Sequence, residues 1–352
     1  MTGRTARAPS AREEACAEEP GTPLRGGPGT PDPAEPGTLD PVDPSALIPA
    51  ALAAVEDLVA LDASRGATAA VPAVRELLRR LPQLSADPAR LGALDRDLLS
   101  ALAELSEVIG WILFDAGHYR RARRMNARAL ALAELCGDRG TARLTLLNHS
   151  MLETHTGRPR AALETASRVA GPRPLPALVD SLVLVRRAHA TAVLGGDRDA
   201  VALISRARSR FLDGASPDDP PWAWWIDRTE LLGHEGWVLS RLRAWSRAVP
   251  LLYEAATAPG PSYRHLFTAE LLSALVRARA WREAEQLIAD VAPRAAGIGS
   301  VRTTETLGAT AVRLLASPGA PANTRDAAGF LLESLPARAG GRHPLIPRNH
   351  RA

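Results

Sequence analysis

The chain has 352 residues, of which 46% are hydrophobic and 23% charged, and its formal net charge is +4. This composition is ordinary for a water-soluble protein with a substantial core, and two cysteines are too few for a disulfide framework or a cysteine-rich zinc site. The longest apolar runs fall well short of the roughly 18 residues that span a bilayer, and the N-terminus has no secretory signal. We therefore expect a cytoplasmic protein with no membrane attachment.

The first 43 residues form a proline- and glycine-rich leader that almost lacks large apolar side chains. Such a segment buries too little surface to offset the entropy of ordering it, so we expect it to be disordered. It carries four Arg against eight Asp or Glu, a balance of −4, and the rest of the chain therefore carries +8. The leader is either an acidic interaction tail or a segment of no defined role.

From residue 44 to 335 the hydrophobic spacing predicts helices, and this range is expected to be one helical-repeat domain. A flexible, basic tail is expected at 336–352. The expected elements are a helix from 44 to about 61, helices at 71–81, 91–114 and 119–135, hairpins at 141–170, 177–212, 226–258 and 263–294, and a capping pair at 301–316 and 322–335.

A recurring pattern of small residues links the hairpins. Alanine recurs at one place in the second helix of each pair, at Ala122, Ala162, Ala200, Ala248 and Ala284. Twelve residues before these stand Gly110, Ser150, Ala188, Gly236 and Leu272, and seven residues after them stand Ala129, Val169, Ala207, Ala255 and Val291. Small side chains let paired helices cross closely, so the pattern predicts an all-α fold of stacked helical hairpins.

The turn within each hairpin should lie five residues before the alanine. Gly117, Gly157 and Gly195 occupy that place in the first three units, where a helix ends and the chain reverses. Arg243 and Arg279 take the same place in the fourth and fifth units.

No catalytic residue, cofactor site or metal site emerges from the sequence, which has no phosphate loop, nucleophile elbow, paired-histidine zinc motif or dinucleotide fingerprint. The nearest set of ligands is His149, Glu153 and His155. The first two share a helix face and the third points elsewhere, so a hydrogen-bonded histidine is the better interpretation. We expect a protein that is not an enzyme.

Trp222, Trp224 and Trp225 form an unusual aromatic run after an acidic, proline-rich loop. They are either a stacking platform for a ligand or packing of the loop against the next helix, and packing is favoured.

The repeat register identifies a face of each first helix that would line a concave groove for an extended or helical peptide. The alternative is that these are ordinary solvated faces. The candidate partner-binding residues are Glu107, Trp111, Phe114, Asp115, Met151, His155, His189, Trp237, Arg241 and Arg277.

Three phrases resemble the tetratricopeptide (TPR) region of actinobacterial transcriptional regulators that usually carry an N-terminal helix-turn-helix. They are Gly110-Trp111-Ile112-Leu113-Phe114-Asp115-Ala116-Gly117, Gly157-Arg158-Pro159-Arg160-Ala161-Ala162, and Pro221-Trp222-Ala223-Trp224-Trp225 followed by Leu232-Gly233-His234-Glu235-Gly236. The resemblance implies a right-handed α-solenoid of TPR-like hairpins in an intracellular regulator. The chain departs from the family in having the leader where the DNA-binding domain would stand, and Pro72 interrupts the only remaining stretch, residues 58–78.

The first hypothesis is therefore a non-enzymatic TPR-like regulator or adaptor that binds a protein or peptide in a concave groove and acts in transcriptional or developmental regulation. The alternative is a DNA-binding transcriptional regulator with a ligand-sensing TPR domain. Direct DNA binding is not expected, although the arginines at 120–128 are the best candidates for it. The third hypothesis is an enzyme built on helical repeats, which the lack of clustered catalytic or metal-binding residues disfavours. The partner, the sign of regulation and the oligomeric state stay open.

Overall fold

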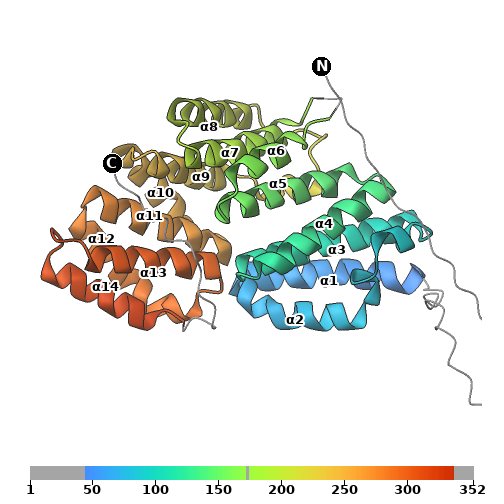
Figure 1. Ribbon diagram of the computed structural model, residues 1–352, viewed down its shortest axis with the longest axis horizontal. Coiled ribbons are helices and arrows are strands. Elements are labelled where there is room, and N and C mark those ends of the chain that lie inside the picture. The colour runs from blue at the N-terminus through green and yellow to red at the C-terminus, as the bar shows by residue number, and fades with distance from the viewer. Residues whose placement is uncertain (1–43, 172–173, 337–352) are drawn as a thin grey trace, which may run out of the picture. The chain divides into compact units, whose positions relative to one another are not determined.

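A computed structural model describes residues 44–171 and 174–336, and all regular structure within these ranges is helical (Figure 1). The predicted leader and residues 337–352 of the predicted tail lie outside the described residues. No helix in the described ranges has the length and apolar character needed to cross a membrane. The α-helices are α1 (Pro44–Arg65), α2 (Ala67–Arg80), α3 (Arg96–Asp115), α4 (Tyr119–Cys136), α5 (Arg139–His155), α6 (Pro159–Ser167), α7 (Ala177–Val193), α8 (Asp197–Leu212), α9 (Arg228–Arg241), α10 (Trp245–Thr257), α11 (His265–Ala278), α12 (Trp281–Val291), α13 (Val301–Leu315) and α14 (Ala322–Ser334). The short 3-10 helices are η1 (Pro82–Leu84), η2 (Pro88–Leu91), η3 (Pro221–Trp225), η4 (Ser262–Arg264) and η5 (Ala292–Gly297).

The all-helical prediction is confirmed, and the largest boundary error lies at α3. This helix was expected from residue 91 but begins at Arg96, because residues 88–91 form a separate 3-10 turn. The Asp95 side chain fixes the start by accepting hydrogen bonds from the backbone amides of Asp97 at 2.8 Å and Leu98 at 3.3 Å. An aspartate in this position satisfies amides that have no partner within the helix.

The repeated small residues lie where two helices approach closely, as the register predicts. The five repeat alanines are all 0% exposed. In the second unit the Ser150 hydroxyl donates a hydrogen bond to the Ala162 carbonyl at 2.9 Å, which ties the two paired positions together. In the fourth unit a Cβ on Gly236 would lie 2.7 Å from Leu252 Cγ and 3.2 Å from the Ala248 carbonyl oxygen.

The predicted turn position has one backbone conformation in all five units. Its φ is +79° at Gly117, +77° at Gly157, +81° at Gly195, +61° at Arg243 and +60° at Arg279. Glycine adopts this left-handed conformation freely, whereas a side chain makes it costly. The two arginines therefore hold the same turn under strain, which shows that packing of the hairpins and not local preference decides the turn.

Consecutive α-helices pack together from α1 to α12, α14 packs with both α12 and α13, and each odd-numbered helix also contacts the next odd-numbered one, from α1 to α13. The late elements also contact the first helices, which the sequence analysis did not predict. The Thr68 amide donates to the Gly299 carbonyl at 2.9 Å, and the Ser262 hydroxyl donates to the Asp62 carbonyl at 2.6 Å. The pair α13 and α14 was expected only to cap the array, but residues just before α13 lie against the start of α2.

The tryptophan run divides between packing and exposure. The Trp222 indole donates to the Gly140 carbonyl at 3.0 Å, and Trp222 and Trp225 pack against a buried cluster around Val179. Trp224 is 73% exposed. The packing interpretation is therefore confirmed for the first and third tryptophans and is wrong for Trp224.

Replacing Gly236 with alanine is expected to lower the free energy of unfolding by about 1–3 kcal/mol, because the new Cβ meets α10. The control is Gly329→Ala in α14, where an added Cβ has no neighbour within 4 Å. At that position the better helix propensity of alanine is expected to raise the free energy of unfolding by about 0.5–1 kcal/mol. Urea unfolding followed by circular dichroism measures both, and equal effects would contradict the close approach of α9 and α10.

Candidate binding site

The ten residues predicted to line a groove fall into three groups by exposure. Glu107, Phe114, Asp115, Met151, His189 and Trp237 are buried, Trp111 and His155 are half-buried, and Arg241 and Arg277 are exposed. An open groove requires accessible side chains, so this part of the prediction is wrong for the six buried residues. They face other parts of the chain: Phe114, Asp115 and Met151 contact Arg302 of α13, whereas Glu107 contacts α5 and His189 packs against Trp237.

Arg302 of α13 fills the space beside α3. It is 2% exposed, and its Nε donates to Asp115 Oδ1 at 2.6 Å. Its guanidinium carbon lies 4.4 Å from the centre of the Phe114 ring and 5.1 Å from that of Trp111. The Ser300 hydroxyl donates to the same carboxylate oxygen at 2.9 Å. A carboxylate and two aromatic faces thus surround one cation, and we call these three side chains with Arg302 the Arg302 seat.

Asp62 of α1 joins the seat to η4. The Trp111 indole donates to Asp62 Oδ2 at 3.0 Å, and the Tyr263 ring meets the Trp111 ring edge-on with centres 6.4 Å apart. Burial and the nearby Asp115 carboxylate raise the pKa of Asp62 to about 6. The contact therefore brings together the first helix, the third helix and a turn about 200 residues later.

His155 lies at the other side of Phe114. Its Nε2 is 3.0 Å from the Tyr119 hydroxyl, and that hydroxyl is also 3.2 Å from Glu305 Oε2 on α13. The rings of His155 and Phe114 meet edge-on with centres 5.6 Å apart. Tyr119 at the start of α4 therefore serves as a polar link between α5 and α13.

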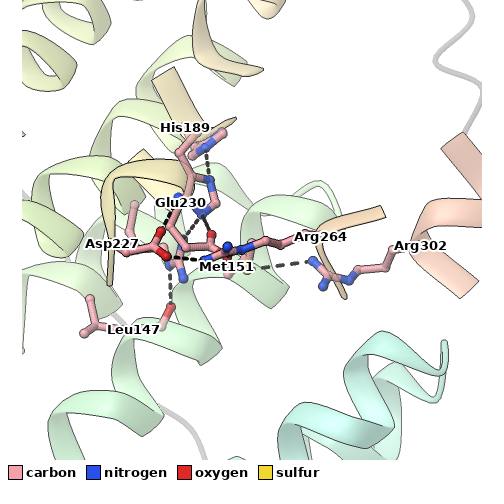
Figure 2. A network of polar contacts seen from close by, with 9 residues as sticks. Leu147, Met151, His189, Asp227, Glu230, Arg264 and Arg302 are labelled. Atoms are coloured by element: carbon pink, nitrogen blue, oxygen red, sulfur yellow. Dashed lines mark hydrogen bonds and ion pairs between the residues drawn. The ribbon is translucent and has the colours of Figure 1, made fainter. Parts of the chain in front are cut away.

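A buried pair of histidines crosses from α7 to α9 (Figure 2). His189 Nε2 lies 3.0 Å from His234 Nδ1, and Arg186 Nη1 lies 3.3 Å from His234 Nε2. Because a guanidinium has only donors, His234 Nε2 accepts and its Nδ1 donates to His189. Burial, with nearby arginines, lowers the pKa of both histidines well below 6.5, so the pair is neutral.

Arg264 of η4 holds two carboxylates at the start of α9 (Figure 2). Its Nη2 lies 2.7 Å from Asp227 Oδ2 and its Nε lies 3.3 Å from Glu230 Oε1. Burial raises the pKa of Glu230 to about 7, against the opposing effect of Arg264. Figure 2 shows Asp227, Glu230 and Arg264 close to His189, with Arg302 reaching Met151.

Five of the ten predicted residues line one small cavity, together with Thr154 and Arg186: Met151, His155, His189, Trp237 and Arg241. Its volume is about 20 Å³, which is room for one or two water molecules. The His189 and Trp237 rings pack with centres 4.4 Å apart, and the Arg241 guanidinium lies 5.4 Å from the Trp237 ring centre. Side chains from α5, α7 and α9 therefore converge at this cavity.

The remaining predicted residues lie apart from this cavity. Glu107 accepts a hydrogen bond from Asn148 Nδ2 at 2.6 Å, and burial raises its pKa to about 7. Burial raises the pKa of Glu270 to about 7, and the positive charges of Arg241 and Arg277 partly oppose this rise. Arg277 itself is exposed.

The candidate ligand set at 149–155 behaves as ordinary helix polar groups. His149 Nε2 lies 3.6 Å from Glu153 Oε1, while His155 turns to Tyr119. Within 44–171 and 174–336, no three histidine, cysteine or acidic side chains are arranged to hold a metal ion.

Sequence reasoning missed the residues that complete the site, namely Asp62, Arg186, Glu230, His234, Arg264 and Arg302. Arg302 and Asp115 are 187 residues apart, and the repeat pattern does not indicate that the two side chains are in contact. Only the phrase around His234 carried a signal, because two glycines flank it on a helix.

A comparison with protein-family models found no match, and a search of curated proteins found none either.

Glu107→Gln is expected to change the pH dependence of stability. With a raised pKa, the folded state binds this proton more tightly than the unfolded state, so the stabilisation is complete below pH 4.5 and is lost as pH rises through about 7. Glutamine keeps an acceptor for Asn148 but does not titrate. The unfolding free energy of the variant, relative to wild type, should rise by roughly 2–3 kcal/mol between about pH 5 and about pH 8.

Denaturant unfolding across this pH range, with the exposed Glu164→Gln as control, measures the effect. A constant difference between Glu107→Gln and wild type would show that Glu107 titrates normally in the folded protein.

Proposed function

We propose that the chain is a non-enzymatic, TPR-like adaptor or regulator that binds a protein or peptide segment through the inner faces of α3, α5, α7 and α9. The proposal includes the right-handed α-solenoid expected from sequence. It is supported by the contacts between successive odd-numbered helices and by the common register of small residues. Stacked hairpins of this kind present side chains from several repeats to one partner.

The observation that carries the proposal is the Arg302 seat. Two aromatic faces and a carboxylate form a typical site for recognising a cationic side chain. The chain's own Arg302 occupies it, donating to Asp115 and lying over Phe114 and Trp111. We infer that an arginine of a partner takes this place when α13 moves aside.

The exchange leaves Asp115 with a cationic partner, because one buried ion pair replaces another. Removing Arg302 alone would leave Asp115, which is 0% exposed, as an uncompensated buried charge. A partner's guanidinium restores the pairing, so binding and opening are coupled. A ligand that interacts better with one of two conformations shifts the population towards it.

The resemblance noted in the sequence suggests transcriptional or developmental regulation as the setting. The alternative, a DNA-binding regulator, is favoured by one observation, the exposed arginines Arg120, Arg121 and Arg124 on α4. Phosphate contacts weaken steeply with salt, so retention on immobilised duplex DNA that falls between low and physiological salt would support that alternative. Under the adaptor proposal the protein is not retained.

Arg302→Ala is expected to lower the free energy of unfolding by about 3–5 kcal/mol, because Asp115 loses its buried partner. Methylguanidinium should then raise the melting temperature of this variant in a saturable way, while methylurea, its neutral counterpart, should not. The exposed Arg313→Ala on the same helix is the control and should respond to neither compound. An identical response of both variants would contradict the seat.

Peptide binding tests the function itself. Arrayed peptides that contain arginine should bind Arg302→Ala more tightly than wild type, and the same peptides with citrulline should lose binding to both. Arg302→Met, which fills the seat with an apolar side chain, should bind the arginine peptides less tightly than Arg302→Ala. Equal binding of arginine and citrulline peptides, or cross-links of bound peptide that fall outside α3, α5, α7 and α9, would overturn the proposal.

A further inference from the structure

A second cavity, of about 630 Å³, lies between α2, α4 and the segment that carries η1 and η2. Its volume falls within the range of about 300–1,000 Å³ that is usual for small-molecule sites. It shares no lining residue with the small inner cavity at Met151. We call it the α2–α4 cavity.

The floor of the α2–α4 cavity is apolar. Leu84, Leu113 and Met125 line it and are buried, and Leu78 lines it from α2 and is half-buried. These side chains come from four elements, so the floor is part of the packed core and is preformed. An apolar group placed here gains stabilisation in proportion to the surface that it removes from water.

The rim of the cavity is cationic. Arg121 and Arg124 line it from α4, are exposed, and stand three residues apart on the same helix face. The lining residues thus carry three arginine charges, from Arg121, Arg124 and Arg128, and one carboxylate, that of Asp87. The balance favours an anion over a cation at the mouth of the cavity.

Arg128, one turn further along α4, provides an independent observation. It lines the cavity and is 8% exposed, and its two terminal nitrogens donate to the backbone carbonyls of Gln83 and Ala86. Its Nε–H has no hydrogen-bond partner within the part of the chain that the structure describes. A buried donor without an acceptor is costly, and the positive charge of this guanidinium attracts an anion in the cavity.

We propose that the α2–α4 cavity binds a small amphiphilic anion, a molecule with an apolar chain or ring system and one carboxylate, sulfonate or phosphate group. The anionic group lies between Arg121 and Arg124, within reach of Arg128, and the apolar body lies over Leu84, Leu113 and Met125. The site does not depend on the peptide-binding proposal, since it uses neither the inner faces nor Arg302.

Two fluorescent probes of the same shape test the charge requirement on the full chain. 1-Anilinonaphthalene-8-sulfonate carries the anion, and N-phenyl-1-naphthylamine is its neutral counterpart. We expect one saturable site for the sulfonate. Arg121→Gln with Arg124→Gln should weaken sulfonate binding by about tenfold or more and change binding of the neutral probe by less than about twofold.

Two further variants separate this site from unspecific dye binding. Ala127→Trp adds bulk at an exposed position of the cavity wall and should abolish binding of both probes. Arg120→Gln removes an exposed arginine of the same helix that does not line the cavity, and should leave both affinities unchanged. Circular dichroism and thermal unfolding establish that each variant is folded.

Competition distinguishes the possible anionic groups. Decanoate and decyl phosphate should displace the sulfonate probe, and decanol should not. A photoreactive decanoate analogue used on wild type, which needs no variant, should label residues of α2, α4 or the segment between α2 and α3. Labelling elsewhere, displacement by decanol as strong as by decanoate, or unchanged sulfonate affinity in the double arginine variant would overturn the proposal.

Discussion

The close approach of paired helices at small side chains is the constraint on which the rest of the structure depends. Ser150 contacts the backbone at Ala162, and Gly236 leaves no room for a Cβ against α10. Once two helices cross this closely, their other apolar side chains are buried mainly against neighbouring hairpins. The positive φ of Arg279, in a place that suits glycine, shows that this packing outweighs local backbone preference.

The sequence predicted the helices and their register because both depend on nearby residues. Hydrophobic spacing, the glycine turns and the repeated alanines act over less than 50 residues, and each describes one hairpin at a time. Boundaries failed where local capping decided them, as at Asp95. The packing prediction failed for Trp224 because the sequence of a turn does not indicate which aromatic side chain faces the protein. Its neighbour Trp225 is packed against the core, whereas Trp224 is exposed.

The candidate site was predictable only in part, for the same reason. The residues of α5, α7 and α9 that share the inner face follow from the register, and they do converge at the cavity beside His189. What fills the space beside α3 depends on packing between hairpins that are far apart in the chain. No local pattern describes that packing, so Arg302, 187 residues from Asp115, could not be assigned to it from sequence. The buried inner face follows from this long-range contact and not from the repeat.

The ionisable groups of the inner face act on stability in opposite directions. Asp62 and Glu230 have raised pKa values, about 6 and about 7, so their stabilisation is lost as pH rises through those values. His189 and His234 have lowered pKa values, so the folded state loses stability as pH falls below 6.5, where they protonate in the unfolded chain. The two effects meet between about pH 6 and 7, where the carboxyl groups are partly protonated and the histidines neutral. Unfolding is therefore favoured on either side of this range, above it because the buried carboxyl groups lose their protons, and below it because the histidines gain protons in the unfolded chain.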